Sequence, residues 1–97
     1  MHILSRGTLR KFWARYPDAR VPLQAWHREV KRATWKTPAD VKAMNRSVSI
    51  LPNNRVVFNI KGNHYRLVVA VQYDYGRVYI RFVGTHQEYD RIDALSI

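Results

Sequence analysis

Four residues in the second half of the chain, Lys61, His64, Arg66 and His86, carry side chains that RNA cleavage requires. Cations bind the scissile phosphate and stabilise its developing charge, and imidazoles move protons at the 2′-hydroxyl and the leaving oxygen. The sequence has no cysteine, and its histidines and carboxylates show no metal-ligand spacing. No glycine-rich phosphate loop precedes a helix. We therefore expect chemistry without a metal ion, a cofactor or a covalent nucleophile.

These residues can meet because the second half of the chain is typical of consecutive β-hairpins. Gly62-Asn63 is a two-residue hairpin signal, and Asp74-Tyr75-Gly76 supplies the next turn. Around these turns, apolar and polar residues alternate as they do in strands with one buried face. The predicted strands span residues 48–51, 55–61, 64–73 and 77–85, and a further short strand is predicted at residues 2–4. The hairpins indicate a single antiparallel sheet.

The lengths of the two turns predict which residues face one another in this sheet. They set Asn59 opposite Arg66, and they set Arg66 opposite Val83 on the next strand. They also bring His64 to the end of that strand, where His86 follows immediately. A shift of one residue in either pairing would separate these side chains.

Alternate residues along each strand point to opposite faces of the sheet. One face is apolar, includes Phe58, Leu67 and Phe82, and is predicted to form the core. The other face is predicted to be polar and basic. Its members are Arg55, Asn59, Lys61, His64, Arg66, Gln72, Arg77, Tyr79, Arg81 and Thr85. This second face is the predicted RNA-binding surface.

The first half of the chain predicts helices. Apolar residues recur at helical spacing in two segments, one capped by Ser5 and ending before Pro17, the other spanning residues 22–35. A third, short helix is predicted from the N-cap Thr37 to Met44, because a proline and an acidic residue follow the cap. Helices followed by hairpins indicate an α+β fold, with the N-terminal helices packed on one face of the sheet.

A chain of 97 residues is long enough to bury one core, so residues 1–97 are predicted to form a single domain. Its longest apolar runs, such as residues 67–71, are far shorter than the roughly 20 residues needed to span a bilayer. The first six residues do not have the pattern of a secretory signal. The absence of cysteine agrees with a reducing compartment. These features favour a cytoplasmic protein without a membrane partner.

The net charge of +10 at pH 7 favours polyanionic partners, namely nucleic acid, the ribosome or an acidic protein. Most of this excess, +8, lies in residues 1–46. Basic residues predicted on the outer helix surfaces are Lys11, Arg15, Arg28, Lys31 and Arg32. They can bind ribosomal RNA phosphates, be covered by a protein partner, or only be solvated, and the sequence leaves these three alternatives open.

Two motifs resemble a known family. The segment Phe58 to Val68 (FNIKGNHYRLV) resembles the central hairpin of HigB-type toxins, and Val83 to Asp90 (VGTHQEYD) resembles their C-terminal signature. Residues 65–68 (YRLV) are also similar to the stretch that carries a catalytic arginine in RelE toxins. The order of elements agrees along almost the whole chain, with the specific motifs confined to residues 58–90.

This resemblance implies a RelE-like fold and a toxin of a type II toxin–antitoxin system. It further implies ribosome-dependent cleavage of mRNA in the ribosomal A site, with ribosomal RNA as a second contact. The toxin would be neutralised by a HigA-type helix-turn-helix antitoxin, which also represses the operon. Operator DNA would therefore be bound only through the antitoxin.

The resemblance also implies roles for individual residues. By motif position, Arg66 would hold the phosphate, His86 would be a second catalytic basic residue, and Tyr89 would transfer a proton or stack on a base. Lys61 would supply charge, but RelE uses two lysines where this chain has one, so the general base stays open. Asp90 would support His86 or Arg66 by an ion pair. The remaining residues expected to bind substrate are Asn59, His64, Arg81 and Arg55. Attack by the 2′-hydroxyl implies a cyclic phosphate product.

Simpler structural roles compete at the same positions. Arg66 and Arg81 can pair with acidic groups on an exposed sheet face, and this role suits Arg81 better because it is predicted opposite Val68 near the sheet centre. His86 can act as a helix cap. At the level of function, a non-catalytic RNA- or ribosome-binding module would use the same basic face. A third reading is an inactive partner that only assembles with a helix-turn-helix repressor.

Overall fold

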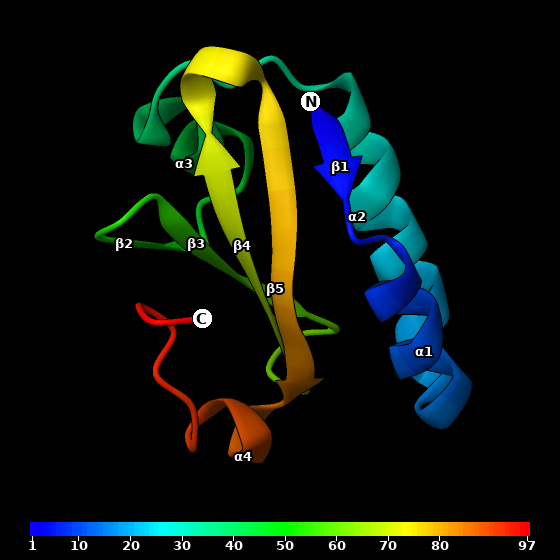
Figure 1. Ribbon diagram of the computed structural model, residues 1–97. Coiled ribbons are helices and arrows are strands. Elements are labelled where there is room, and N and C mark those ends of the chain that lie inside the picture. Colours follow the sequence, from blue (N-terminus) through cyan, green and yellow to red (C-terminus); the bar gives the residue numbers. More distant parts are fainter.

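The computed structural model describes residues 1–97 and consists of one five-stranded sheet with a helical layer against it (Figure 1). Two single-turn 3-10 helices, η1 and η2, interrupt the sequence of larger elements. In chain order the elements are β1 (His2–Leu4), α1 (Gly7–Arg15), η1 (Pro17–Ala19), α2 (Arg20–Arg32), α3 (Pro38–Met44), β2 (Ser49–Leu51), β3 (Arg55–Ile60), β4 (Tyr65–Gln72), η2 (Tyr73–Tyr75), β5 (Arg77–Thr85) and α4 (His86–Tyr89). The predicted α+β class is confirmed, although α4 lies at the C-terminal end and not with the other helices.

The three N-terminal helices were predicted correctly in number but not in every boundary. Ser5 does not cap α1: its φ of 68° places it in the left-handed region, and its carbonyl accepts a turn hydrogen bond from the Thr8 N–H. α2 begins at Arg20, because η1 leads directly into it, and it ends at Arg32. Trp35, predicted as the end of that helix, instead lies beyond it and is buried against the ring of Phe58.

Local capping determines α3 as predicted. The Thr37 hydroxyl accepts a hydrogen bond from the Asp40 N–H, and the Asp40 carboxylate accepts one from the Thr37 N–H. Pro38 occupies the first helical position, where no N–H is needed. This arrangement is the capping box that the sequence indicated.

The sheet has the strand order β1-β5-β4-β3-β2, and it is mixed. β2, β3, β4 and β5 pair in antiparallel fashion, but β1 pairs in parallel with β5, so the prediction of a wholly antiparallel sheet is wrong. A parallel pair needs a crossover connection, which no turn signal in the sequence reveals. Here α1, α2 and the following elements separate β1 from its partner.

The helical layer buries one face of the sheet. Leu9 and Phe12 of α1, with Leu23 and Trp26 of α2, pack against strand residues such as Phe58. The C-terminal segment covers part of the other face (Figure 1, red), where Ala94 packs on Val57 and Val68, two strand residues that were assigned to neither face from the sequence. The second face was predicted to be polar and basic throughout. This prediction is wrong in part, because the face carries a small apolar cluster.

A β-bulge changes the pairing of β4 with β5. From Gln72 to Val69 the register is as predicted, but one extra β5 residue, Arg81, is inserted before Val68 pairs with Phe82. Arg81 is thus not opposite Val68. The insertion also turns Phe82 to the face of the small apolar cluster and Val83 to the helical face, which reverses the prediction for Phe82.

None of the helices has the length and apolar character that would allow it to cross a membrane.

Candidate active site

At one end of the sheet the structure brings together three of the four residues predicted to converge, and Lys61 is the exception. The β3–β4 register sets Asn59 opposite Arg66, as predicted, but Arg66 now lies opposite Gly84 and not Val83. Two residues further along, the backbone N–H of His86 donates to the carbonyl of His64 at 3.1 Å. The ends of β4 and β5 therefore bring His64, Arg66 and His86 to the same corner of the molecule.

Arg66 is half-buried, and its guanidinium has no acidic partner. Its Nη1 lies 3.3 Å from the carbonyl oxygens of Asn63 and of Tyr65, so only neutral groups hold it in place. The molecule contains two ion pairs, and neither includes Arg66. The charge of Arg66 thus remains available to an anion. The alternative that Arg66 only forms an ion pair with an acidic side chain does not apply in this structure.

His86 is the first residue of α4 and lies beside Asp90 one turn later. Its Nδ1 is 3.2 Å from Asp90 Oδ2, and half of its side-chain surface is exposed. The carboxylate thus lies within ion-pair distance of one ring nitrogen, and Nε2 has no hydrogen-bond partner within the protein that would compete with a substrate. Of the two partners that the sequence offered Asp90, the structure places it beside His86 and not in an ion pair with Arg66.

The start of α4 is itself fixed by side chains. The Thr85 hydroxyl accepts from the Glu88 N–H at 3.1 Å, and the Glu88 carboxylate accepts from the Thr85 N–H at 2.8 Å. This capping box holds the first turn, and with it the imidazole of His86, at a defined angle to the end of β5. This role of Thr85 and Glu88 was not predicted from the sequence, although their spacing is the capping-box signal.

Gly84 is a second residue that the sequence analysis missed. A Cβ built on it would lie 2.5 Å from Phe82 Cζ and 3.2 Å from Glu88 Oε1. The ring of Phe82 thus lies over Gly84. Gly84 is the residue of β5 that pairs with Arg66 of β4. A side chain here would displace the ring or the capping box.

Tyr89 follows His86 by three residues, which places both on the same side of the short helix turn. Its ring is partly buried against the cluster of Val57, Val68 and Ala94. This packing fixes the position of the ring close to the β4 strand that carries Arg66.

Lys61 is positioned differently from the other candidates. Its Nζ lies 2.6 Å from Asp18 Oδ2, and the second oxygen of Asp18 accepts from the Tyr65 hydroxyl at 2.5 Å. Asp18 belongs to η1 in the helical layer, and Tyr65 faces that layer while Arg66 faces away from it. The ammonium of Lys61 is thus engaged on the helical side of the sheet.

This triad changes the acidity of its members. The hydrogen bond from Lys61, followed by that from Tyr65, holds the pKa of Asp18 below its usual value. The hydrogen bond to Asp18, followed by burial, raises the pKa of Tyr65 to about 12. Asp18 was not a candidate from the sequence, because no local signal connects η1 with a hairpin more than 40 residues away.

Of the other candidates for substrate binding, Asn59 and His64 lie near this corner, whereas Arg81 and Arg55 do not gather as closely. The Asn59 amide donates to the Ser47 carbonyl at 3.5 Å beside Arg66, and His64 Nδ1 lies 2.9 Å from the Lys61 carbonyl in its own turn. Arg81, exposed at the bulge, places its guanidinium 5.5 Å from the centre of the Tyr79 ring. Arg55 lies opposite Ala70, away from the corner, and donates two hydrogen bonds to the main-chain oxygen of Ile97.

The corner can bind a phosphate at Arg66 and exchange a proton at His86. It has a guanidinium without an acidic partner, a solvent-facing imidazole supported by Asp90, and an aromatic ring at Tyr89. No group of three or more His, Cys, Asp or Glu side chains is placed to hold a metal ion. General acid–base cleavage of a phosphodiester is the chemistry for which these groups are suited.

The known proteins to which the chain is similar over nearly its whole length all carry the same family name. Residues 19–92 match the family model of the HigB toxin, described as the RelE-like toxic component of a toxin–antitoxin system. The mRNA interferase toxin HigB of Escherichia coli (strain K12) is 31% identical over 97 residues, covering 98% of this chain and 93% of the relative. The mRNA interferase HigB of Shigella flexneri gives the same values. That of Escherichia coli O6:H1 (strain CFT073) is 22% identical over 94 residues, covering 95% and 91%.

Proposed function

Because the chain belongs to the HigB family of RelE-like toxins, we propose that it blocks translation by cutting mRNA on the ribosome, with Arg66 and His86 at the centre of its active site. The family makes the chain an mRNA interferase, and so an endoribonuclease, with an antitoxin as partner. The observation that carries the proposed site is the meeting of an arginine without an acidic partner and an Asp90-supported histidine at the ends of β4 and β5.

In the proposed reaction the 2′-hydroxyl of the RNA attacks the adjacent phosphorus. The O2′–P bond forms and the P–O5′ bond breaks, which leaves a 2′,3′-cyclic phosphate and a free 5′-hydroxyl. Arg66 binds the non-bridging oxygens and stabilises the charge that builds on them in the transition state. The absence of an acidic partner supports this role, because a guanidinium already paired with a carboxylate would bind phosphate less strongly.

Two protons must move in this reaction, one from the 2′-hydroxyl and one to O5′. We assign the donor for O5′ to His86, because it is an exposed imidazole at this corner with the carboxylate of Asp90 within ion-pair distance. Tyr89 and His64 are the groups near this corner that can accept the 2′-hydroxyl proton. Tyr89 is also placed to stack on a base. Lys61 contributes charge from the edge of the site, because its ammonium is paired with Asp18.

Ribosome dependence is proposed because the corner offers few strong bases and is open to solvent. His64 and His86 are exposed, so the site does not by itself enclose a substrate. A ribosome that holds the mRNA in its A site would supply the positioning that such a site lacks. The remaining parts of the proposal are a HigA-type helix-turn-helix antitoxin as the neutralising partner and action in the cytoplasm, with no metal ion required.

The test is primer extension on a message incubated with the purified protein, with and without ribosomes. We expect cuts with ribosomes from the wild type, and a loss of at least about a hundredfold in Arg66→Ala and in His86→Ala. The matched control is Arg77→Ala, which removes an exposed arginine of β5 that stacks on Tyr75 at the far end of the sheet. If folded wild-type protein left the message uncut under both conditions, the result would favour the non-catalytic binding module. If it cut free RNA, cleavage would not depend on the ribosome.

A further inference from the structure

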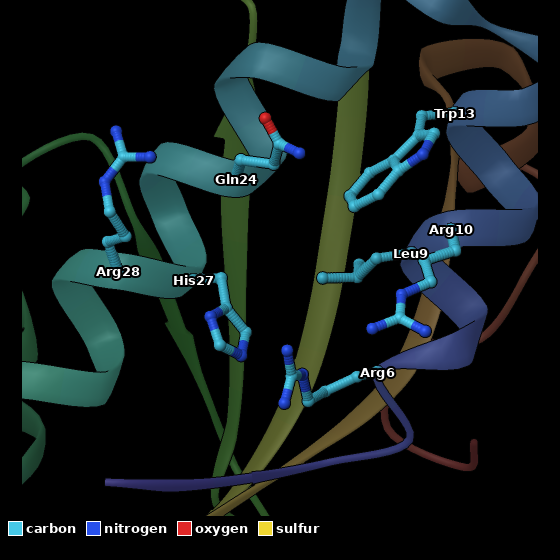
Figure 2. Close-up of a pocket in the computed structure, with 7 residues that line it drawn as sticks. All are labelled: Arg6, Leu9, Arg10, Trp13, Gln24, His27 and Arg28. Atoms are coloured by element: carbon cyan, nitrogen blue, oxygen red, sulfur yellow. The ribbon is translucent and has the colours of Figure 1, made fainter.

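A second basic site lies between α1 and α2, on the helical side of the sheet and away from Arg66. The pocket measures about 370 Å³. Figure 2 shows side chains from the two helices entering the same space from opposite sides, with Arg6 directed toward His27. The residues that matter here are Arg6, Arg10 and Trp13 from the α1 side, and Gln24, His27 and Arg28 from α2.

The cations of this pocket have no counter-charge within the protein. Arg6, Arg10 and Arg28 line it, no Asp or Glu does, and neither of the two ion pairs of the molecule involves any of them. A second pocket of about 400 Å³ shares Arg6 and His27 and extends the positive surface to Lys31. Several cations held close together without an acid repel one another, and a bound anion relieves that repulsion.

The other lining groups favour a nucleotide over a simple carboxylate. A volume of about 370 Å³ falls within the range of small-ligand sites, roughly 300–1,000 Å³. Trp13 is only partly buried, so its flat indole can stack on a base, and the Gln24 amide can hydrogen-bond to a base edge. Arginine guanidinium groups bind phosphate with two parallel hydrogen bonds. An acidic peptide would use the arginines but not the aromatic face.

We infer that the pocket between α1 and α2 binds one nucleotide of an RNA strand, with a phosphodiester on Arg6 and Arg10 and a base against Trp13. This inference rests on the proposed function, since it takes RNA as the ligand. It adds a binding site in the helical layer, where it holds RNA without taking part in cleavage. Free nucleotides share this chemistry, and the test separates the two sources.

Binding at this pocket depends on pH in a defined direction. Burial, together with Arg6, Lys31 and Arg10, lowers the pKa of His27 below its ordinary value. A phosphate beside the ring favours its protonated form, so RNA binding tightens as pH falls from 7.5 toward about 5.5. The phosphodiester groups stay ionised throughout. The charged and titratable groups around His27 are Arg6, Arg10, Arg28, Lys31, His2 and the α-amino group of Met1.

The experiment measures the anisotropy of a labelled, 2′-O-methylated RNA oligonucleotide, which cannot be cut by 2′-hydroxyl attack. We expect Arg6→Gln/Arg10→Gln to weaken binding about tenfold or more, and Trp13→Leu about fivefold or more. The control Lys36→Gln/Arg46→Gln removes the same charge from exposed basic residues outside the pocket and should weaken binding by less than about threefold. Circular dichroism confirms that each variant is folded.

Several results would overturn the inference. Equal losses in the pocket and control variants would mean that only net charge matters. Unchanged RNA binding with weakened antitoxin binding would make the pocket a protein interface. Adenosine monophosphate that binds without displacing the oligonucleotide would exclude an RNA strand as the ligand. Failure of the proposed function is distinguishable, because it appears in the cleavage assay and leaves this binding assay unaffected.

The pH arm uses His27→Gln, with His2→Gln as its control. The wild type and His2→Gln should both bind the oligonucleotide more tightly at pH 5.5 than at pH 7.5. His27→Gln should lose most of that difference. The same pH dependence in all three proteins would contradict a role for His27.

Discussion

Arg66 lies directly opposite Gly84 in the pairing of β4 with β5, one residue beyond the partner that the turn lengths alone predict. The shift arises from the bulge at Arg81, which adds a residue to β5. The shift places Gly84 beside Arg66. Because Gly84 has no side chain, the Phe82 ring can lie over the strand at this point. The bulge therefore shapes the surroundings of the proposed phosphate-binding residue.

This relationship predicts that Gly84→Ala destabilises the protein and impairs the site. The new methyl group would lie 2.5 Å from Phe82 Cζ, so the ring must move, at a cost of about 1–3 kcal/mol. Urea denaturation measures the loss. The control is Gly7→Ala, where a Cβ meets nothing within 4 Å, and its stability should change by less than about 1 kcal/mol. Equal effects of both substitutions would contradict the packing argument.

Asp90 acts through His86, so its removal should be milder than removal of His86. We expect Asp90→Asn to reduce the single-turnover cleavage rate on ribosomes by about tenfold, against at least about a hundredfold for His86→Ala. The apparent affinity for programmed ribosomes should change little, because the carboxylate does not contact substrate in this proposal. Asp90→Glu should recover part of the rate. A larger loss in Asp90→Asn than in His86→Ala would assign the chemistry to the carboxylate.

The pairing of Lys61 with Asp18 predicts a modest role in cleavage for this lysine. We expect Lys61→Met to lower the cleavage rate by about tenfold or less, whereas Arg66→Ala removes it, because the ammonium is already engaged on the helical side. The double variant Lys61→Met/Asp18→Asn should cleave as well as Lys61→Met. A loss in Lys61→Met as large as in Arg66→Ala would show that the lysine leaves Asp18 and enters the site during the reaction.

Tyr65 should make stability depend on pH in alkaline solution. Its pKa is about 12 in the folded protein, against an ordinary value of 10.0, so the folded state holds the proton more tightly. The resulting stability is fully present below pH 10 and is lost as pH rises from about 10 to 12. Tyr65→Phe cannot titrate, so the difference in melting temperature between it and the wild type should shrink over this interval. Comparison with the variant cancels the effect of the other five tyrosines.

Much of the architecture could be predicted from the sequence because it depends on neighbours in the chain. The capping box at Thr37 and Asp40 joins residues three positions apart, and the hairpin at Gly62-Asn63 fixes the pairing of Asn59 with Arg66. The two longer helices followed from the spacing of their apolar residues. The family motifs, which also lie in local sequence, pointed to the corner that holds Arg66 and His86.

The rest depends on contacts between residues far apart in the chain, which no local pattern encodes. The parallel pairing of β1 with β5 needs a crossover, and the bulge at Arg81 lets Phe82 and Val83 fill different apolar clusters. The hydrogen bonds of Asp18 join η1 to the β3–β4 hairpin. By itself the sequence determined the helices, the hairpins and the charges. Only the tertiary structure decided which charges lie without a partner, because that depends on where the helical layer and the C-terminal segment pack.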